Sequence, residues 1–146
     1  MDWIRWAALA GVQARAVYTD VKRGTIENML IVTGLVIGLI CAGIRGGPMG
    51  CLQSVKMAGI VLAMLFLLFV MRGLGAGDIK LLCVVAAFFP EQAMTILATS
   101  FLAGGVLAIG KIIFRRIKKE KVSLRKETIH FSIPIALGTW ITLIGI

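Results

Sequence analysis

Two aspartates occupy positions in the sequence that could support acid–base chemistry. Asp20 lies in the run Tyr-Thr-Asp-Val-Lys-Arg-Gly, and Asp78 ends the run Gly-Leu-Gly-Ala-Gly-Asp. Each lies at the edge of a long apolar stretch, where a carboxylate is costly and usually marks a function or a partner. Two carboxylates brought together cannot both be charged at low cost, so they share one proton. One can then activate a water while the other donates a proton, as the hydrolysis of an amide bond requires.

Each aspartate also has an ordinary structural explanation. Asp78 could cap the helix that follows it, and Asp20 could pair with a neighbouring basic residue at an interface. The glycines that precede Asp78, Gly75 and Gly77 among them, allow the backbone to unwind or to approach another helix closely. An unwound stretch would free polar groups to bind an extended substrate strand. The two explanations stay open for each aspartate taken alone, and the pair favours catalysis.

Other catalytic groups have weaker support in the sequence. His130 is the only histidine, so a metal site with two histidines is impossible, and its place before the last apolar segment favours an interfacial role. Four serines have no histidine or lysine at an informative spacing: Ser54, Ser100, Ser123 and Ser132. The three cysteines form no Cys-x-x-Cys pair, which favours thiols buried in a membrane over a disulfide framework or a zinc site. We therefore expect neither a metal nor a cofactor.

The elements that position these residues are predicted to be membrane helices. Hydrophobic residues make up 59% of the 146 residues, and the mean hydropathy is +0.96, far more apolar than a soluble domain. A bilayer core of about 30 Å needs roughly 20 apolar residues per helix. Six apolar segments are present: 3–18, 29–44, 52–70, 78–89, 92–114 and 129–146. The sequence therefore predicts an all-α, polytopic membrane bundle of about six transmembrane helices, in one domain over residues 1–146.

Two of these segments depart from the simple pattern. Segment 78–89 is too short to cross alone, so it must lean on its neighbours or begin in a cavity. Segment 3–18 is short and contains charged residues, and an amphipathic helix on the membrane surface is the alternative for it.

The net charge of +9 is unevenly placed along the chain. Eight lysines and arginines fall within 111–126, and others flank the links after the first and third segments. The positive-inside rule places such links in the cytoplasm, so Asp20 and Asp78 should meet on the cytoplasmic side of the cell membrane. The basic 111–128 loop could also hold anionic lipid. No aromatic platform accompanies the charge, so we expect no nucleic-acid partner.

The two aspartate motifs resemble those of a known family. Residues 75–78, Gly-Ala-Gly-Asp, resemble the Gly-x-Gly-Asp motif of intramembrane aspartyl proteases, and the continuation Ile79–Leu81 looks like the prepilin peptidase branch. Asp20, followed by basic residues and then by Ile26–Asn28, resembles the first aspartate motif of that family, an Asp followed by an Ile-Pro-Asn step. Glu27 stands where the family usually has proline. Residues 131–134, Phe-Ser-Ile-Pro, loosely resemble its entry to the last helix.

The resemblance implies a membrane aspartic endopeptidase with Asp20 and Asp78 as the catalytic dyad. Its substrate would be a type IV pilin-like precursor, of the Flp/Tad or preflagellin kind, whose short basic leader is removed at the cytoplasmic face. The cysteine-rich insert and methyltransferase region of the larger bacterial enzymes are missing, which implies the compact form and cleavage without N-methylation. The residues expected to bind substrate or support the dyad are Lys22, Asn28, Gly75, Gly77 and Lys80. The oligomeric state is left open.

A non-enzymatic membrane protein is the alternative. A small transporter or assembly subunit could use the two aspartates to bind a cation or a proton, because carboxylates beside broken helices are common in transporters. The short chain lacks inverted-repeat symmetry, and its carboxylates lie near one face rather than at the midplane. These features favour the peptidase.

Overall fold

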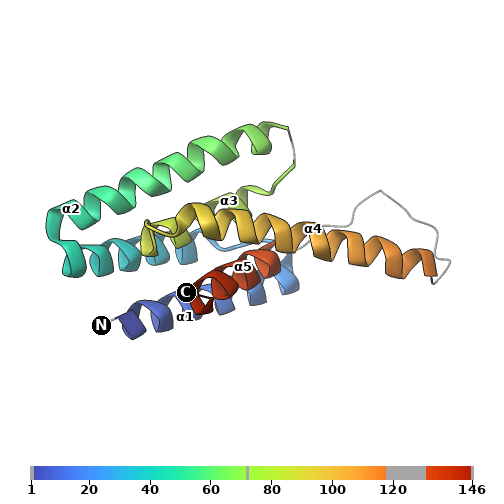
Figure 1. The fold of residues 1–146 in the computed structure, drawn as a ribbon, viewed down its shortest axis with the longest axis horizontal. Helices are drawn as coiled ribbons and strands as arrows, with labels where there is room; N and C mark the ends of the chain where they lie inside the picture. The colour runs from blue at the N-terminus through green and yellow to red at the C-terminus, as the bar shows by residue number, and fades with distance from the viewer. Residues whose placement is uncertain (1, 72, 118–130, 146) are drawn as a thin grey trace.

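A computed structural model describes residues 2–71, 73–117 and 131–145 of the chain (Figure 1). Its elements in chain order are α1 (Asp2–Arg23), α2 (Asn28–Val70), α3 (Ala76–Phe88), α4 (Ala93–Ile117) and α5 (Ser132–Ile144). These described ranges contain no strand, which confirms the all-α fold class. Residues 111–117 of the predicted basic loop continue α4, whereas 118–128 and His130 lie outside the described residues.

The long α2 consists of two helical stretches that fold back on each other. Gly47 has φ 58° and ψ −148°, a conformation that favours glycine. Pro48 follows it and cannot donate a backbone hydrogen bond to a continuous helix. The thiol of Cys51 lies 3.5 Å from the carbonyl oxygen of Leu39, across the reversal. The two stretches therefore correspond to the separate predicted segments 29–44 and 52–70, and Figure 1 shows the reversal in α2.

Two helices are long and apolar enough to cross a membrane. They are α2, and α4 over Ala93–Phe114; α5 is apolar but has only 13 residues. The remaining helices do not meet this criterion of length and composition within the described ranges. A count of about six transmembrane helices therefore remains a prediction.

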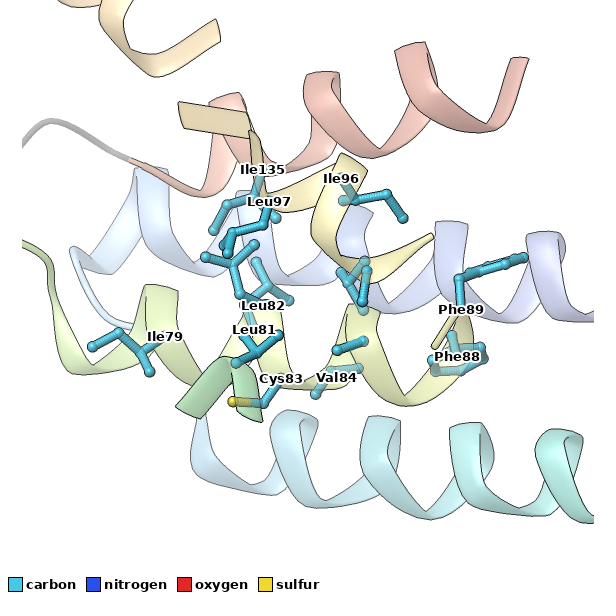
Figure 2. Packing of buried hydrophobic residues seen from close by; sticks show 14 of the residues in the cluster. Ile79, Leu81, Leu82, Cys83, Val84, Phe88, Phe89, Ile96, Leu97 and Ile135 are labelled. Carbon is cyan, nitrogen blue, oxygen red and sulfur yellow. The ribbon is translucent and has the colours of Figure 1, made fainter. Parts of the chain in front are cut away.

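The short α3 is the central helix of the fold. Nine of its 13 residues are buried, Ile79 and every residue from 81 to 88, so it is covered around its whole circumference. Figure 2 shows its side chains among residues of other helices, such as Leu97 of α4 and Ile135 of α5. The helix is only about 20 Å long, shorter than a bilayer core. Its neighbours cover it on all sides, as the sequence analysis expected for the short segment 78–89.

Side chains from α1 and α2 satisfy the carbonyl groups at the end of α3. The hydroxyl of Ser54 donates a hydrogen bond of 2.9 Å to the carbonyl oxygen of Ala87. The guanidinium of Arg5 donates to the carbonyl oxygen of Phe88 and lies 4.4 Å from the centre of the Phe89 ring. The last carbonyls of a helix lack partners within it, and a cation is favourable there. These contacts fix α3 along its axis and therefore fix its other end.

Several helix ends gather at one end of the bundle. The C-terminal ends of α1 and α2 and the N-terminal ends of α3 and α5 lie near the middle of Figure 1, whereas the reversal of α2 and both chain termini lie farther to the left and α4 extends to the right. One prediction was wrong in detail. Asp20 was expected in the first link, but α1 continues to Arg23, so Asp20 lies in the last turn of this helix.

Candidate active site

A cleft of about 330 Å³ lies where these helix ends meet. It is formed by the end of α1, the α1–α2 link, the start of α2 and the start of α3. Ten residues line it: Asp20, Gly24, Thr25, Ile26, Asn28, Gly75, Ala76, Gly77, Asp78 and Lys80. Six of the seven residues that the sequence singled out are in this set, both aspartates included. The fold thus brings two carboxylates that are distant in the chain to one cavity.

Asp20 is held by a contact from the opposite end of the chain. Its side chain is buried, with 6% of the residue exposed. The hydroxyl of Ser132, the first residue of α5, donates a hydrogen bond of 2.6 Å to Oδ2 of Asp20. The sequence analysis considered Ser132 only as a nucleophile and missed this role. Pro134, in the first turn of a helix where proline is well accepted, was the local signal that a helix begins at this serine.

Asp78 lies in the first turn of α3, two residues after the helix begins at Ala76. A carboxylate is favourable there because the N-terminal end of a helix carries partial positive charge. The N-cap is Gly75, so Asp78 does not occupy the capping position that the sequence analysis considered for it. A Cβ on Gly75 would lie 2.9 Å from Oδ2 of Asp78, and a Cβ on Gly77 would lie 3.4 Å from Ile26. Both glycines therefore permit close approach at the cleft.

The two predicted lysines differ in their surroundings. Nζ of Lys80 donates a hydrogen bond of 2.8 Å to Oδ1 of Asn28, which joins the start of α3 to the start of α2 at the edge of the cleft. Lys22 is exposed, and its Nζ lies 2.9 Å from the hydroxyl oxygen of Tyr18 on the same helix. Lys22 is absent from the described residues that line the cleft. A role for Lys22 at the dyad remains a prediction, without a contact that supports it.

Comparison with known proteins identifies the family of the chain. Residues 7–109 match the type IV leader peptidase family. The chain belongs to this family. The match confirms the resemblance inferred from the two aspartate motifs.

Two curated relatives give the extent of the similarity. They are prepilin leader peptidase/N-methyltransferases of Aeromonas salmonicida, one of them from strain A449. Each is 30% identical over 151 residues, an alignment that covers 95% of this chain and 50% of the relative. The chain thus spans about half the length of the curated relatives that it matches. No solved structure matches it significantly.

Glu27 stands where the first aspartate motif of the family has proline, and the backbone conformation of Glu27 is compatible with proline. In this leader peptidase family member, Glu27 is the N-cap of α2, with φ −65° and ψ 129°. Its carboxylate pairs with Arg23 at 2.9 Å and with Arg15 at 3.6 Å, and both arginines are 66% exposed. The proline ring fixes φ near −65°, so the glutamate adopts the conformation that a proline would impose. The ion pairs connect the end of α1 to the start of α2.

We therefore expect Glu27→Pro to be tolerated. Proline would restrict the unfolded chain, a gain of about 0.4–1 kcal/mol at a compatible site, and would lose exposed ion pairs that contribute at most about 1 kcal/mol. Ile26, which precedes Glu27, lies outside both helices. This placement suits proline at position 27, because the residue before a proline disfavours the helical conformation. Thermal unfolding in detergent should change by no more than about 1 kcal/mol, with cleavage close to wild type. Glu27→Ala, which loses the ion pairs without gaining rigidity, is the control and should be the less stable of the two variants.

Within the described residues, no three histidine, cysteine, aspartate or glutamate side chains cluster as a metal site would require. The ionisable groups that line the cleft are the two carboxylates and the ammonium of Lys80. A cleft with two carboxylates can move protons to and from a bound amide. Acid–base hydrolysis is the chemistry that these residues can perform.

Proposed function

We propose that the chain is a membrane aspartic endopeptidase that removes the short basic leader of type IV pilin-like precursors. The observation that carries the proposal is one cleft lined by both Asp20 and Asp78, in a member of the type IV leader peptidase family. One carboxylate takes a proton from a water, which attacks the carbonyl carbon of the scissile peptide bond. The other donates its proton to the carbonyl oxygen, which gives a tetrahedral diol. As the C–N bond breaks, the first carboxyl passes the proton taken from the water to the leaving nitrogen, and the second takes a proton back from a hydroxyl of the diol.

A second cavity supports a substrate with an apolar segment. A groove of about 240 Å³ adjoins the cleft and shares Ala76 and Lys80 with it. Its other lining residues are the apolar Leu62, Phe66, Phe69 and Ile79. A peptide whose scissile bond lies in the cleft can continue into this groove with apolar side chains. A pilin-like precursor, basic before the cut and apolar after it, has this character.

The exposed surface supports a membrane location. On α4, Leu102, Val106 and Ile109 are 70%, 69% and 59% exposed and follow a helical spacing. A large apolar face of this kind needs a nonpolar cover, and lipid provides it. We propose a single membrane domain of about six crossings. Basic residues flank the first and third links, and the helix ends beside these links form the cleft end, so this end faces the cytoplasm.

The test is to incubate the purified chain in liposomes with a pilin-like precursor and S-adenosylmethionine. We expect the precursor to lose its leader, and the intact mass of the product to show no added methyl group. The proposed reaction has no methylation step, whereas the curated relatives are named as both leader peptidases and N-methyltransferases, so the mass of the product distinguishes the two reactions. A precursor that keeps its full length would contradict the proposal. Cation flux into the same liposomes would then favour the transporter alternative.

A further inference from the structure

The strongest unexplained contact at the cleft is the one between Ser132 and Asp20. Ser132 is fully buried, and its hydroxyl lies 2.6 Å from Oδ2 of Asp20. The hydroxyl is the donor of this bond and the carboxylate oxygen is its acceptor. A length of 2.5–2.7 Å is typical of an O–H···O⁻ bond, which is stronger than a bond between neutral groups. A bond of this kind restricts the rotation of the carboxylate that accepts it.

A second buried contact locks the register of the same two helices. Nε2 of Gln13 donates a hydrogen bond of 2.9 Å to the hydroxyl oxygen of Thr139. Gln13 and Asp20 are seven residues apart on α1, and Ser132 and Thr139 are seven residues apart on α5. The two hydrogen bonds are therefore about 10 Å apart along an antiparallel helix pair. Two bonds at matching intervals define how α5 lies against α1.

The helix that carries Ser132 is also fixed from its other side. The hydroxyl of Thr99 on α4 donates to the carbonyl oxygen of Gly138 at 3.0 Å and lies 2.8 Å from the hydroxyl of Thr142. Catalytic groups are held most accurately by residues on rigid elements whose own positions are determined by packing and hydrogen bonds. Ser132 meets this description.

We propose that Ser132 is the positioning residue for Asp20, and that its hydroxyl holds the carboxylate in the orientation that proton transfer in the cleft requires. This inference rests on the proposed peptidase function. Ser132 neither attacks the substrate nor binds it; it acts through Asp20. Misplacing a reacting group by about 1 Å can cost roughly 100-fold in rate. Loss of the hydroxyl therefore lowers the rate of the chemical step rather than the affinity for the precursor.

The experiment compares three variants of the full chain, purified in detergent, with a pilin-like precursor as substrate. Ser132→Ala removes the hydroxyl, Ser132→Thr keeps it, and Thr139→Val removes the other α1–α5 hydrogen bond without touching Asp20. We expect Ser132→Ala to lower kcat about 10- to 100-fold with KM within about twofold of wild type. Ser132→Thr should recover most of that loss. Thr139→Val should lower thermal stability and leave kcat within about threefold, because Thr99 still holds α5 and Ser132 still bonds to Asp20.

Each outcome decides between a positioning role and a purely structural one. Wild-type kcat in Ser132→Ala overturns the inference, as does a change confined to KM. An equal loss of kcat in Thr139→Val also overturns it, because general loosening of α1 and α5 would then explain the effect. If Ser132→Ala is too unstable to assay, Ser132→Thr is compared with Ser132→Cys, whose thiol is a weak donor. A lower kcat in Ser132→Cys than in Ser132→Thr then supports the inference, and equal kcat values overturn it.

Asp20→Asn is measured alongside these variants. Full cleavage by Asp20→Asn refutes the dyad itself, whereas an inactive Asp20→Asn beside a fully active Ser132→Ala refutes only the role of Ser132.

Discussion

Asp20→Asn and Asp78→Asn should each lower the rate of precursor cleavage by at least about 1,000-fold. Asparagine has nearly the shape of aspartate but can neither take a proton from water nor donate one as a carboxylic acid. General acid–base catalysis by a positioned group contributes about 100- to 10,000-fold, and each aspartate takes part in the same proton exchange. The measurement is the initial rate of leader removal from a pilin-like precursor by purified protein.

The double variant sharpens this prediction. Residues that act as a unit are strongly non-additive, so Asp20→Asn combined with Asp78→Asn should be no slower than either single variant. Glu91→Gln is the matched control. This carboxylate is exposed and lies 3.7 Å from Arg45 outside the cleft, so its loss should leave the rate unchanged. Full processing by either single aspartate variant, with wild-type folding, would rule out the dyad.

The sequence predicted the six helical stretches from hydrophobicity, but it misplaced the end of the first one. The apolar run of segment 3–18 ends before the helix does, and α1 continues to Arg23. Gly24 then has φ 66°, and its N–H donates a hydrogen bond of 2.7 Å to the carbonyl oxygen of Asp20. A glycine in this conformation is a common helix terminator, and basic residues are favoured just before it. The pair Arg23-Gly24 was therefore a usable signal for the end of α1.

The sequence also identified the aspartates but not the residue that holds one of them. Asp20 and Asp78 stood out because each is charged beside an apolar run, which is a local property. Ser132 has no such local property: its importance comes from a hydrogen bond to a residue 112 positions away. That pairing depends on the register of α5 against α1, which the contact between Gln13 and Thr139 helps to set. No spacing along the chain expresses this register, so it could be obtained only from the structure.

Gly138→Ala should destabilise the protein by about 2–3 kcal/mol. A Cβ at this position would lie 2.5 Å from Cα of Ser100 and 2.6 Å from its Oγ. The Cα belongs to the backbone of α4, so it cannot rotate away. Extra volume in a packed interior costs about 1–3 kcal/mol, and an obstruction by backbone lies at the upper end. Thermal unfolding in detergent measures the loss.

Gly105→Ala is the matched control, because a Cβ there meets nothing within 4 Å. It adds the same methyl group to α4 and should be neutral or stabilising by about 0.5–1 kcal/mol through helix propensity. Cleavage should fall in Gly138→Ala as well, because α5 carries Ser132 about 9 Å along the helix from Gly138. Moving α5 away from α4 would displace the hydroxyl that holds Asp20. Equal stability of the two variants would show that α4 and α5 do not cross closely at Gly138, and the support that we assign to the Asp20 side of the cleft would be lost.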